Sequence, residues 1–97
     1  MAGSTMAIEV IRVNGTRENR RIGTRDPFAE INKLIGCDVT DTINLRDGRI
    51  MLVDDLGHQK NLSVNPIATD MYWAVCRPGT RHQIVGDVIV AVDADFA

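Results

Sequence analysis

The sequence predicts a single α+β domain, in which a mixed or antiparallel sheet of about five strands carries two helices on one face, around one core. Two observations support this fold class. Apolar, β-branched segments occur in pairs around an Asn-Gly and an Asp-Gly dipeptide, which favour hairpins. Two other segments space their apolar residues by three and four, as amphipathic helices do. The expected order is ββαββαβ.

The chain of 97 residues has the length of one domain. We expect that domain to span residues 7–92, between a flexible tail at residues 1–6 and a frayed tail at residues 93–97. The sequence shows no signal peptide and no apolar run long enough to cross a membrane, so a cytoplasmic protein without membrane contact is expected. Its two cysteines, Cys37 and Cys76, are then expected to be free thiols.

The first hairpin is expected from residues 7–13, rich in β-branched residues, and residues 16–22, a polar returning strand. The Asn-Gly dipeptide between them suits a two-residue turn, because both residues tolerate a positive φ. That turn would place Glu9 opposite Arg20, which is an attractive cross-strand pair.

A helix is expected to begin at Asp26-Pro27, because aspartate caps free N–H groups and proline suits the first helical position. Gly36 suits a left-handed C-cap at the other end. The apolar stripe of this helix comprises Phe28, Ile31, Leu34 and Ile35.

The next segment, residues 37–45, alternates between apolar and polar residues, and only Asp41 interrupts its apolar face. An Asp-Gly turn then leads into a returning strand at residues 49–53. A second helix is expected after Asn65-Pro66, by the same capping logic as the first. Residues 84–92 form the most apolar segment and predict the last strand.

Basic residues are concentrated near one end of the sequence. Between Arg12 and Arg25 there are five arginines and one acidic residue, whereas residues 37–97 hold five basic and nine acidic residues. Arginine suits carboxylate or phosphate recognition, although a solvated edge strand that resists pairing would need the same charges. No aromatic residue lies among these arginines, and the net charge is −2, so nucleic acid is not an expected partner.

In the second helix, Trp73 lies at the edge of the expected apolar stripe of Ala68, Met71, Tyr72 and Val75. It would either anchor a partner or complete a small core. The predicted partner-binding residues are therefore Arg17, Arg20, Arg21, Arg25 and Trp73.

No catalytic or metal-binding constellation is evident. Cys37, His58, Cys76 and His82 supply atoms that zinc prefers, but none belongs to a closely spaced pair as in structural zinc sites. Cys76 lies near His82 in the sequence, yet nothing supplies a third group to orient the imidazole. We therefore expect no metal, no cofactor and no enzymatic activity.

The run NLSVNPIATDMYW at residues 61–73, followed by QIVGDVIVAV at residues 83–92, resembles a family of small uncharacterised proteins, a domain of unknown function. This family is found in phages, plasmids and genomes of actinobacteria and related bacteria. The resemblance covers residues 7–92 and implies a source and a fold, but no mechanism. The matching residues are Gly36, Gly57, Asn65, Ala68, Thr69, Val85, Gly86 and Asp87.

Within this motif, Asn65, Thr69 and Asp87 would either cap a helix and bond backbone groups or form a small polar pocket. Taken together, the sequence favours a non-catalytic phage- or plasmid-type accessory protein that binds and modulates a host macromolecule, above all a host protein. The alternative is a ligand-binding protein that holds a nucleotide or other phosphate-containing molecule through the arginine-rich hairpin. A homodimer is also expected, because exposed sheet edges offer self-complementary contacts.

Overall fold

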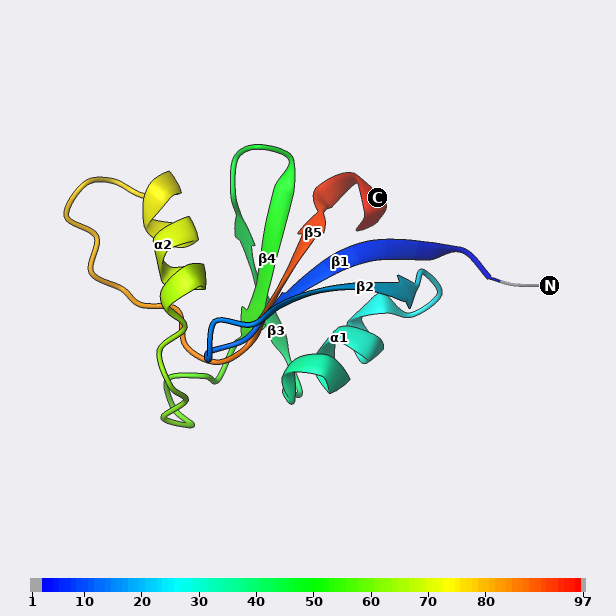
Figure 1. The fold of residues 1–97 in the computed structure, drawn as a ribbon, viewed down its shortest axis with the longest axis horizontal. Coiled ribbons are helices and arrows are strands. Elements are labelled where there is room, and N and C mark those ends of the chain that lie inside the picture. Colours follow the sequence, from blue (N-terminus) through cyan, green and yellow to red (C-terminus); the bar gives the residue numbers. More distant parts are fainter. Residues whose placement is uncertain (1–2, 97) are drawn as a thin grey trace.

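The computed structural model describes residues 3–96 and shows a five-stranded antiparallel sheet with one helix on each face (Figure 1). The predicted α+β class and the strand and helix order are confirmed, and every strand pairing is antiparallel. No helix in residues 3–96 is long and apolar enough to cross a membrane. The elements are β1 (Thr5–Ile11), β2 (Arg17–Gly23), α1 (Pro27–Ile35), β3 (Thr40–Asn44), β4 (Arg49–Asp54), α2 (Pro66–Val75), β5 (Val88–Val92) and a 3₁₀ helix, η1 (Asp93–Phe96).

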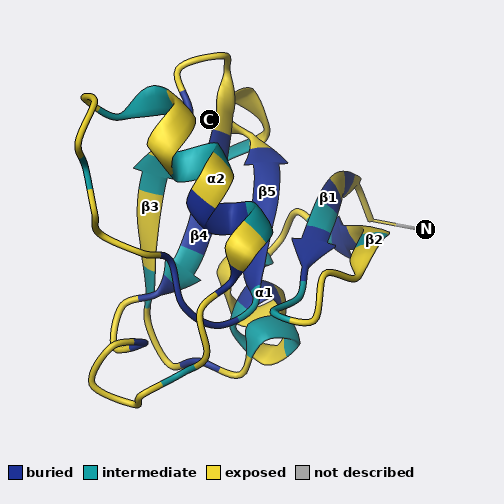
Figure 2. Ribbon diagram, turned by 60° about the vertical axis from the view of Figure 1, so that its left-hand side comes forward, coloured by how far each residue is buried: buried dark blue, intermediate teal, exposed yellow. Residues whose placement is uncertain are grey.

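The last strand, β5, lies at the centre of the sheet. The strand order is β2-β1-β5-β4-β3, so β5 joins the hairpin of β1 and β2 to the hairpin of β3 and β4. Its first four residues are buried, whereas β3 has only exposed and half-buried residues (Figure 2). The sheet therefore has a covered centre and two open edges, β2 and β3.

The two helices cover opposite faces of the sheet, so the expectation that both lie on one face around one core is wrong. Ile50 and Leu52 of β4 pack in the same core as Ile31 of α1, whereas Met51 packs with Ala68 of α2. Successive side chains of a strand point to opposite faces. Because β4 has consecutive apolar residues, both of its faces need a cover.

Both hairpins have three-residue loops instead of the expected two-residue turns, because the N–H of Arg12 donates to the carbonyl of Thr16 and that of Leu45 to the carbonyl of Arg49. Gly15 and Gly48 occupy the last loop positions, with φ values of 88° and 86°. A loop whose third residue is left-handed is the next most common solution after the two-residue turn. It shifts the pairing by one residue, so that Glu9 faces Asn19 and not Arg20.

The predicted helix ends are confirmed. The Asp26 carboxylate accepts the N–H of Ala29 at 3.4 Å, and Asn65 Oδ1 accepts the N–H of Ala68 at 3.1 Å. Gly36 ends α1 with a φ of 69°, in the left-handed region. Local capping chemistry therefore determines where both helices begin and where α1 ends.

Strands β3 and β5 are shorter than the predicted segments 37–45 and 84–92. Both predicted tails are partly ordered. Gly86 has a φ of 78°, so the extended segment before it does not run into β5. Strand β1 begins at Thr5, and Met6 is only 3% exposed, so these two residues do not belong to a flexible tail. At the other end, the ring of Phe96 in η1 packs 5.4 Å from that of Phe28. Residues 1, 2 and 97 lie outside the described part of the chain.

Candidate binding site

The arginine-rich hairpin distributes its charges over both faces of the sheet. Alternate residues of β2 point to opposite faces, and Ile22 packs in the core on the α1 side. Arg20 shares the face of Ile22, whereas Arg17 and Arg21 belong to the α2 side. The predicted arginines therefore do not form a single face.

Arg17 is occupied by an ion pair on the α2 side. Its guanidinium donates to both carboxylate oxygens of Glu9, at 2.8 and 3.0 Å. These hydrogen bonds raise the pKa of Arg17. Arg25 is exposed in the loop before α1 and makes no side-chain hydrogen bond with the described residues. Arg17 thus supports the pairing of β1 with β2, while Arg25 is free in solvent.

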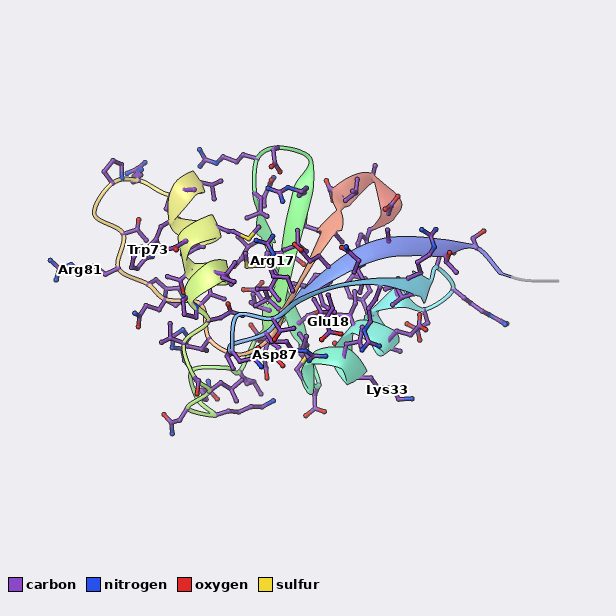
Figure 3. All side chains as sticks on the ribbon, in the orientation of Figure 1. Arg17, Glu18, Lys33, Trp73, Arg81 and Asp87 are labelled. Atoms are coloured by element: carbon purple, nitrogen blue, oxygen red, sulfur yellow. The ribbon has the colours of Figure 1, made fainter. Side chains whose placement is uncertain are left out.

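A groove of about 270 Å³ lies between β2 and α1 and brings basic residues together. We call it the β2–α1 groove. Ile22 is 5% exposed and forms an apolar floor together with Leu34. Lys33 extends outward from α1 (Figure 3) and belongs to the lining of the groove. The groove is lined by Arg20, Arg21, Ile22, Glu30, Lys33 and Leu34.

The arginines that line the β2–α1 groove make only exposed side-chain hydrogen bonds with the described residues. Arg20 donates to Glu18 at 3.1 Å, and Arg21 Nε donates to Thr5 Oγ1 at 2.9 Å. Exposed contacts of this kind contribute little to stability, and a guanidinium has five N–H donors. Both arginines therefore keep donors for a ligand. The carboxylate of Glu30 is already used, because it accepts the backbone N–H of Gly23 at 2.6 Å.

Arg12, which was not among the predicted site residues, holds the fold together. Its Nη1 donates to Asp87 Oδ2 and to the carbonyl of Leu34, both at 2.9 Å. The other Asp87 oxygen accepts the N–H of Val13 at 2.9 Å. The hydrogen bond with Asp87 is the main cause of the raised pKa of Arg12. This network ties the first hairpin to α1 and to the segment before β5.

Asn65 and Thr69 are also engaged by the fold. Asn65 is fully buried and donates from Nδ2 to the carbonyls of Ile11 at 2.9 Å and Gly86 at 3.0 Å. The Thr69 hydroxyl accepts the N–H of Ile84 at 3.0 Å and lies 3.3 Å from its carbonyl. With Asp87 bound to Arg12, the structural interpretation of this motif is favoured over the polar pocket.

Trp73 lies on α2, far from Lys33 and the groove (Figure 3). Its side chain is 40% exposed, and its indole N–H donates to the carbonyl of His82 at 2.7 Å. This hydrogen bond fixes the loop between α2 and β5. The predicted partner-binding residues thus fall on separate parts of the molecule.

Sequence reasoning missed a second cavity of about 260 Å³, bordered by β3, β4, α2 and the loops before α2 and β5. We call it the β3–α2 cavity. The one signal in the sequence was Asp41, the acidic residue on an otherwise apolar strand face. The cavity contains His58 and His82, whose ring centroids are 4.8 Å apart. Its polar and aromatic lining includes Asp41, Asp54, Asp55, His58, Tyr72 and His82.

The two cysteines do not complete a metal site with these histidines. Cys37 is buried beside Asn32, and Cys76 ends α2; both are free. Within residues 3–96, no three His, Cys, Asp or Glu side chains are arranged to hold a metal ion.

Comparisons of the chain with protein-family models, with curated proteins and with solved structures found no match. The resemblance to small phage and plasmid proteins therefore stays a prediction. The interpretation of the β2–α1 groove depends on its own geometry and charge.

Proposed function

We propose that this chain is a non-catalytic accessory protein that binds an acidic, extended segment of a host protein in the β2–α1 groove. The β2–α1 groove is the observation that carries this proposal. It combines two cationic side chains on the α1 side, Arg20 and Lys33, with an apolar floor, whereas Arg21 borders the groove from the strand and directs its side chain to the other face. The carboxylate in its lining, Glu30, accepts a backbone N–H and is outnumbered by the cations. A surface of this charge attracts and orients acidic partners.

An extended segment fits because β2 is an edge strand. Among the described strands it pairs with β1 alone, so the backbone groups along its outer side are open to another strand, apart from the Gly23 N–H that Glu30 binds. Peptides that add to a sheet edge gain affinity from backbone hydrogen bonds and specificity from side-chain pockets. Here acidic side chains would meet Arg20 and Lys33, and an apolar side chain would lie over Ile22.

A phosphate-containing ligand is less well supported. Phosphate groups commonly bind where several backbone N–H groups converge at a helix N-terminus. At the start of α1 the Asp26 carboxylate occupies this position, and Glu30 adds a second negative charge in the first turn. Both charges repel a phosphate group. The nucleotide alternative therefore becomes an outcome of the experiment below.

The host protein and the cytoplasmic location in this proposal come from the resemblance to phage and plasmid proteins. Free cysteines suit a reducing compartment such as the cytoplasm. Binding through exposed charges should weaken with salt, because screening acts over about 8–10 Å at physiological ionic strength.

The experiment is affinity capture from an actinobacterial lysate, using the tagged wild-type chain and a triple variant with Arg20→Ser, Arg21→Ser and Lys33→Ser. We expect the wild type to retain an acidic protein that 0.5 M salt releases, and the triple variant to lose it. Arg49→Ser is the matched control, since Arg49 lies outside the groove and pairs with Asp47.

The outcome that contradicts the proposal is capture of the same protein by the triple variant at low salt. Thermal shifts with ATP and with inorganic phosphate, measured on the same proteins, address the alternative. A saturable stabilisation by ATP that the triple variant loses would replace the acidic segment with a phosphate-containing ligand.

A further inference from the structure

The β3–α2 cavity carries negative charge that its own chain does not neutralise. Asp54 is 7% exposed and forms an ion pair with Lys60 at 2.7 Å. Asp41 and Asp55 form no ion pair with any residue in the described part of the chain. The proposed function does not use this cavity, which lies against the opposite face and edge of the sheet from the β2–α1 groove.

Three rings line the cavity next to these carboxylates. The ring centroids of Tyr72 and His82 are 6.0 Å apart in an edge-on arrangement, and those of His58 and His82 are 4.8 Å apart. A hydrogen bond with Cys76, and then burial, raises the pKa of the Tyr72 phenol. The His58 ring is held by the carbonyl of Gln83, 3.0 Å from Nε2. The face of a tyrosine ring attracts cations.

Apolar residues also line the cavity. Asp41 pairs directly with Val53 across the β3–β4 ladder, and Ile43 and Ile84 also contribute to the lining. Apolar surroundings exclude water and strengthen the attraction between opposite charges. A cation in this cavity would therefore meet carboxylates as well as apolar and aromatic side chains.

We propose that the β3–α2 cavity binds a guanidinium group, with Asp41 and Asp55 as the acceptors and the Tyr72 and histidine rings as the surface on which it stacks. A guanidinium is planar, carries five N–H donors, and is weakly hydrated, so it binds carboxylates and aromatic faces at once. A metal ion fits less well, because the lining offers no set of three ligands arranged to hold one.

The test is calorimetric titration of the full chain with butylguanidine, a free guanidinium compound, and with the blocked tripeptide Gly-Arg-Gly, which presents the same group on a peptide. Butylurea, which has a similar shape without the charge, is the control ligand. We expect saturable binding of at least one guanidinium probe and none of butylurea. The tighter probe identifies the source as a small molecule or as an arginine side chain of a protein.

Variants locate the site. Asp41→Asn and Asp55→Asn should each weaken binding at least tenfold, while Asp47→Asn, at the exposed tip of the β3–β4 hairpin, should leave it unchanged. Asp41 and Asp55 are exposed, and asparagine keeps the oxygen with which Asp41 accepts the N–H of Thr42, so both variants should fold. Circular dichroism checks this. The absence of binding by both probes, or undiminished binding by both folded variants, would overturn the proposal.

Discussion

Replacing Asn65 with alanine tests how much the hydrogen bonds of its side chain, at the start of α2, stabilise the fold. The side chain is fully buried and serves three partners: the N–H of Ala68 and the carbonyls of Ile11 and Gly86. Asn65→Ala removes the helix cap, which costs about 1 kcal/mol. It also leaves two buried carbonyls without this donor, at about 1–2 kcal/mol each. The free energy of unfolding should therefore fall by about 3–5 kcal/mol.

The assay is urea denaturation, followed by the fluorescence of Trp73, the only tryptophan in the chain. For a domain of this size, 3 kcal/mol corresponds to a fall in Tm of at least about 12 °C. Asn65→Ser keeps an oxygen for the cap, so it should lose about 1 kcal/mol less than Asn65→Ala. Asn19→Ala is the control: Asn19 is exposed on β2, and its loss should cost under about 0.5 kcal/mol.

A loss below about 1 kcal/mol in Asn65→Ala would refute this reasoning. It would mean that other groups or water satisfy the two carbonyls, and that Asn65 does not hold the fold. The polar pocket predicted from the sequence would then become the better interpretation of the motif.

Three further predictions follow from the ionisable groups and the sheet edges. A hydrogen bond from Arg20 is the largest cause of a lowered pKa at Glu18, whose ordinary value is 4.5. The resulting stability is complete above that value and is lost as pH falls through the folded pKa, so Glu18→Gln should flatten the acid limb of a plot of Tm against pH. Burial raises the pKa of Cys37, so a thiol reagent at neutral pH should label Cys76 in the folded protein and Cys37 only after unfolding; equal labelling rates would contradict this. Light scattering should give about twice the chain mass of 10.7 kDa, and a monomer at every concentration would remove the expected homodimer.

Local chemistry was readable from the sequence because it involves neighbours in the chain. Asp26 and Asn65 cap helices that begin one residue later, and Gly36 ends one through its own backbone conformation. The loop lengths of the hairpins were not readable in this way. A glycine after Asn14 fits a two-residue turn and a three-residue loop equally well, and the pairing along the whole strand decides between them.

The placement of the helices could have been predicted with closer attention to β4. Ile50, Met51 and Leu52 are consecutive apolar residues, which is typical of a strand covered on both faces. The sequence carried no sign that Arg20 and Lys33 line the same β2–α1 groove, because this depends on how α1 packs against the hairpin. Asp41 was the one visible sign of the β3–α2 cavity.

The central position of β5 separates the order of synthesis from the order of folding. A ribosome produces both hairpins before β5. The two hairpins join one sheet only when β5, residues 88–92, pairs with β1 on one side and with β4 on the other. Isolated hairpins are marginally stable in water, so the emerging chain exposes unpaired strand edges to aggregation and to chaperones until its last segment is made. A truncation that removes β5 would not shorten this sheet; it would divide it into two.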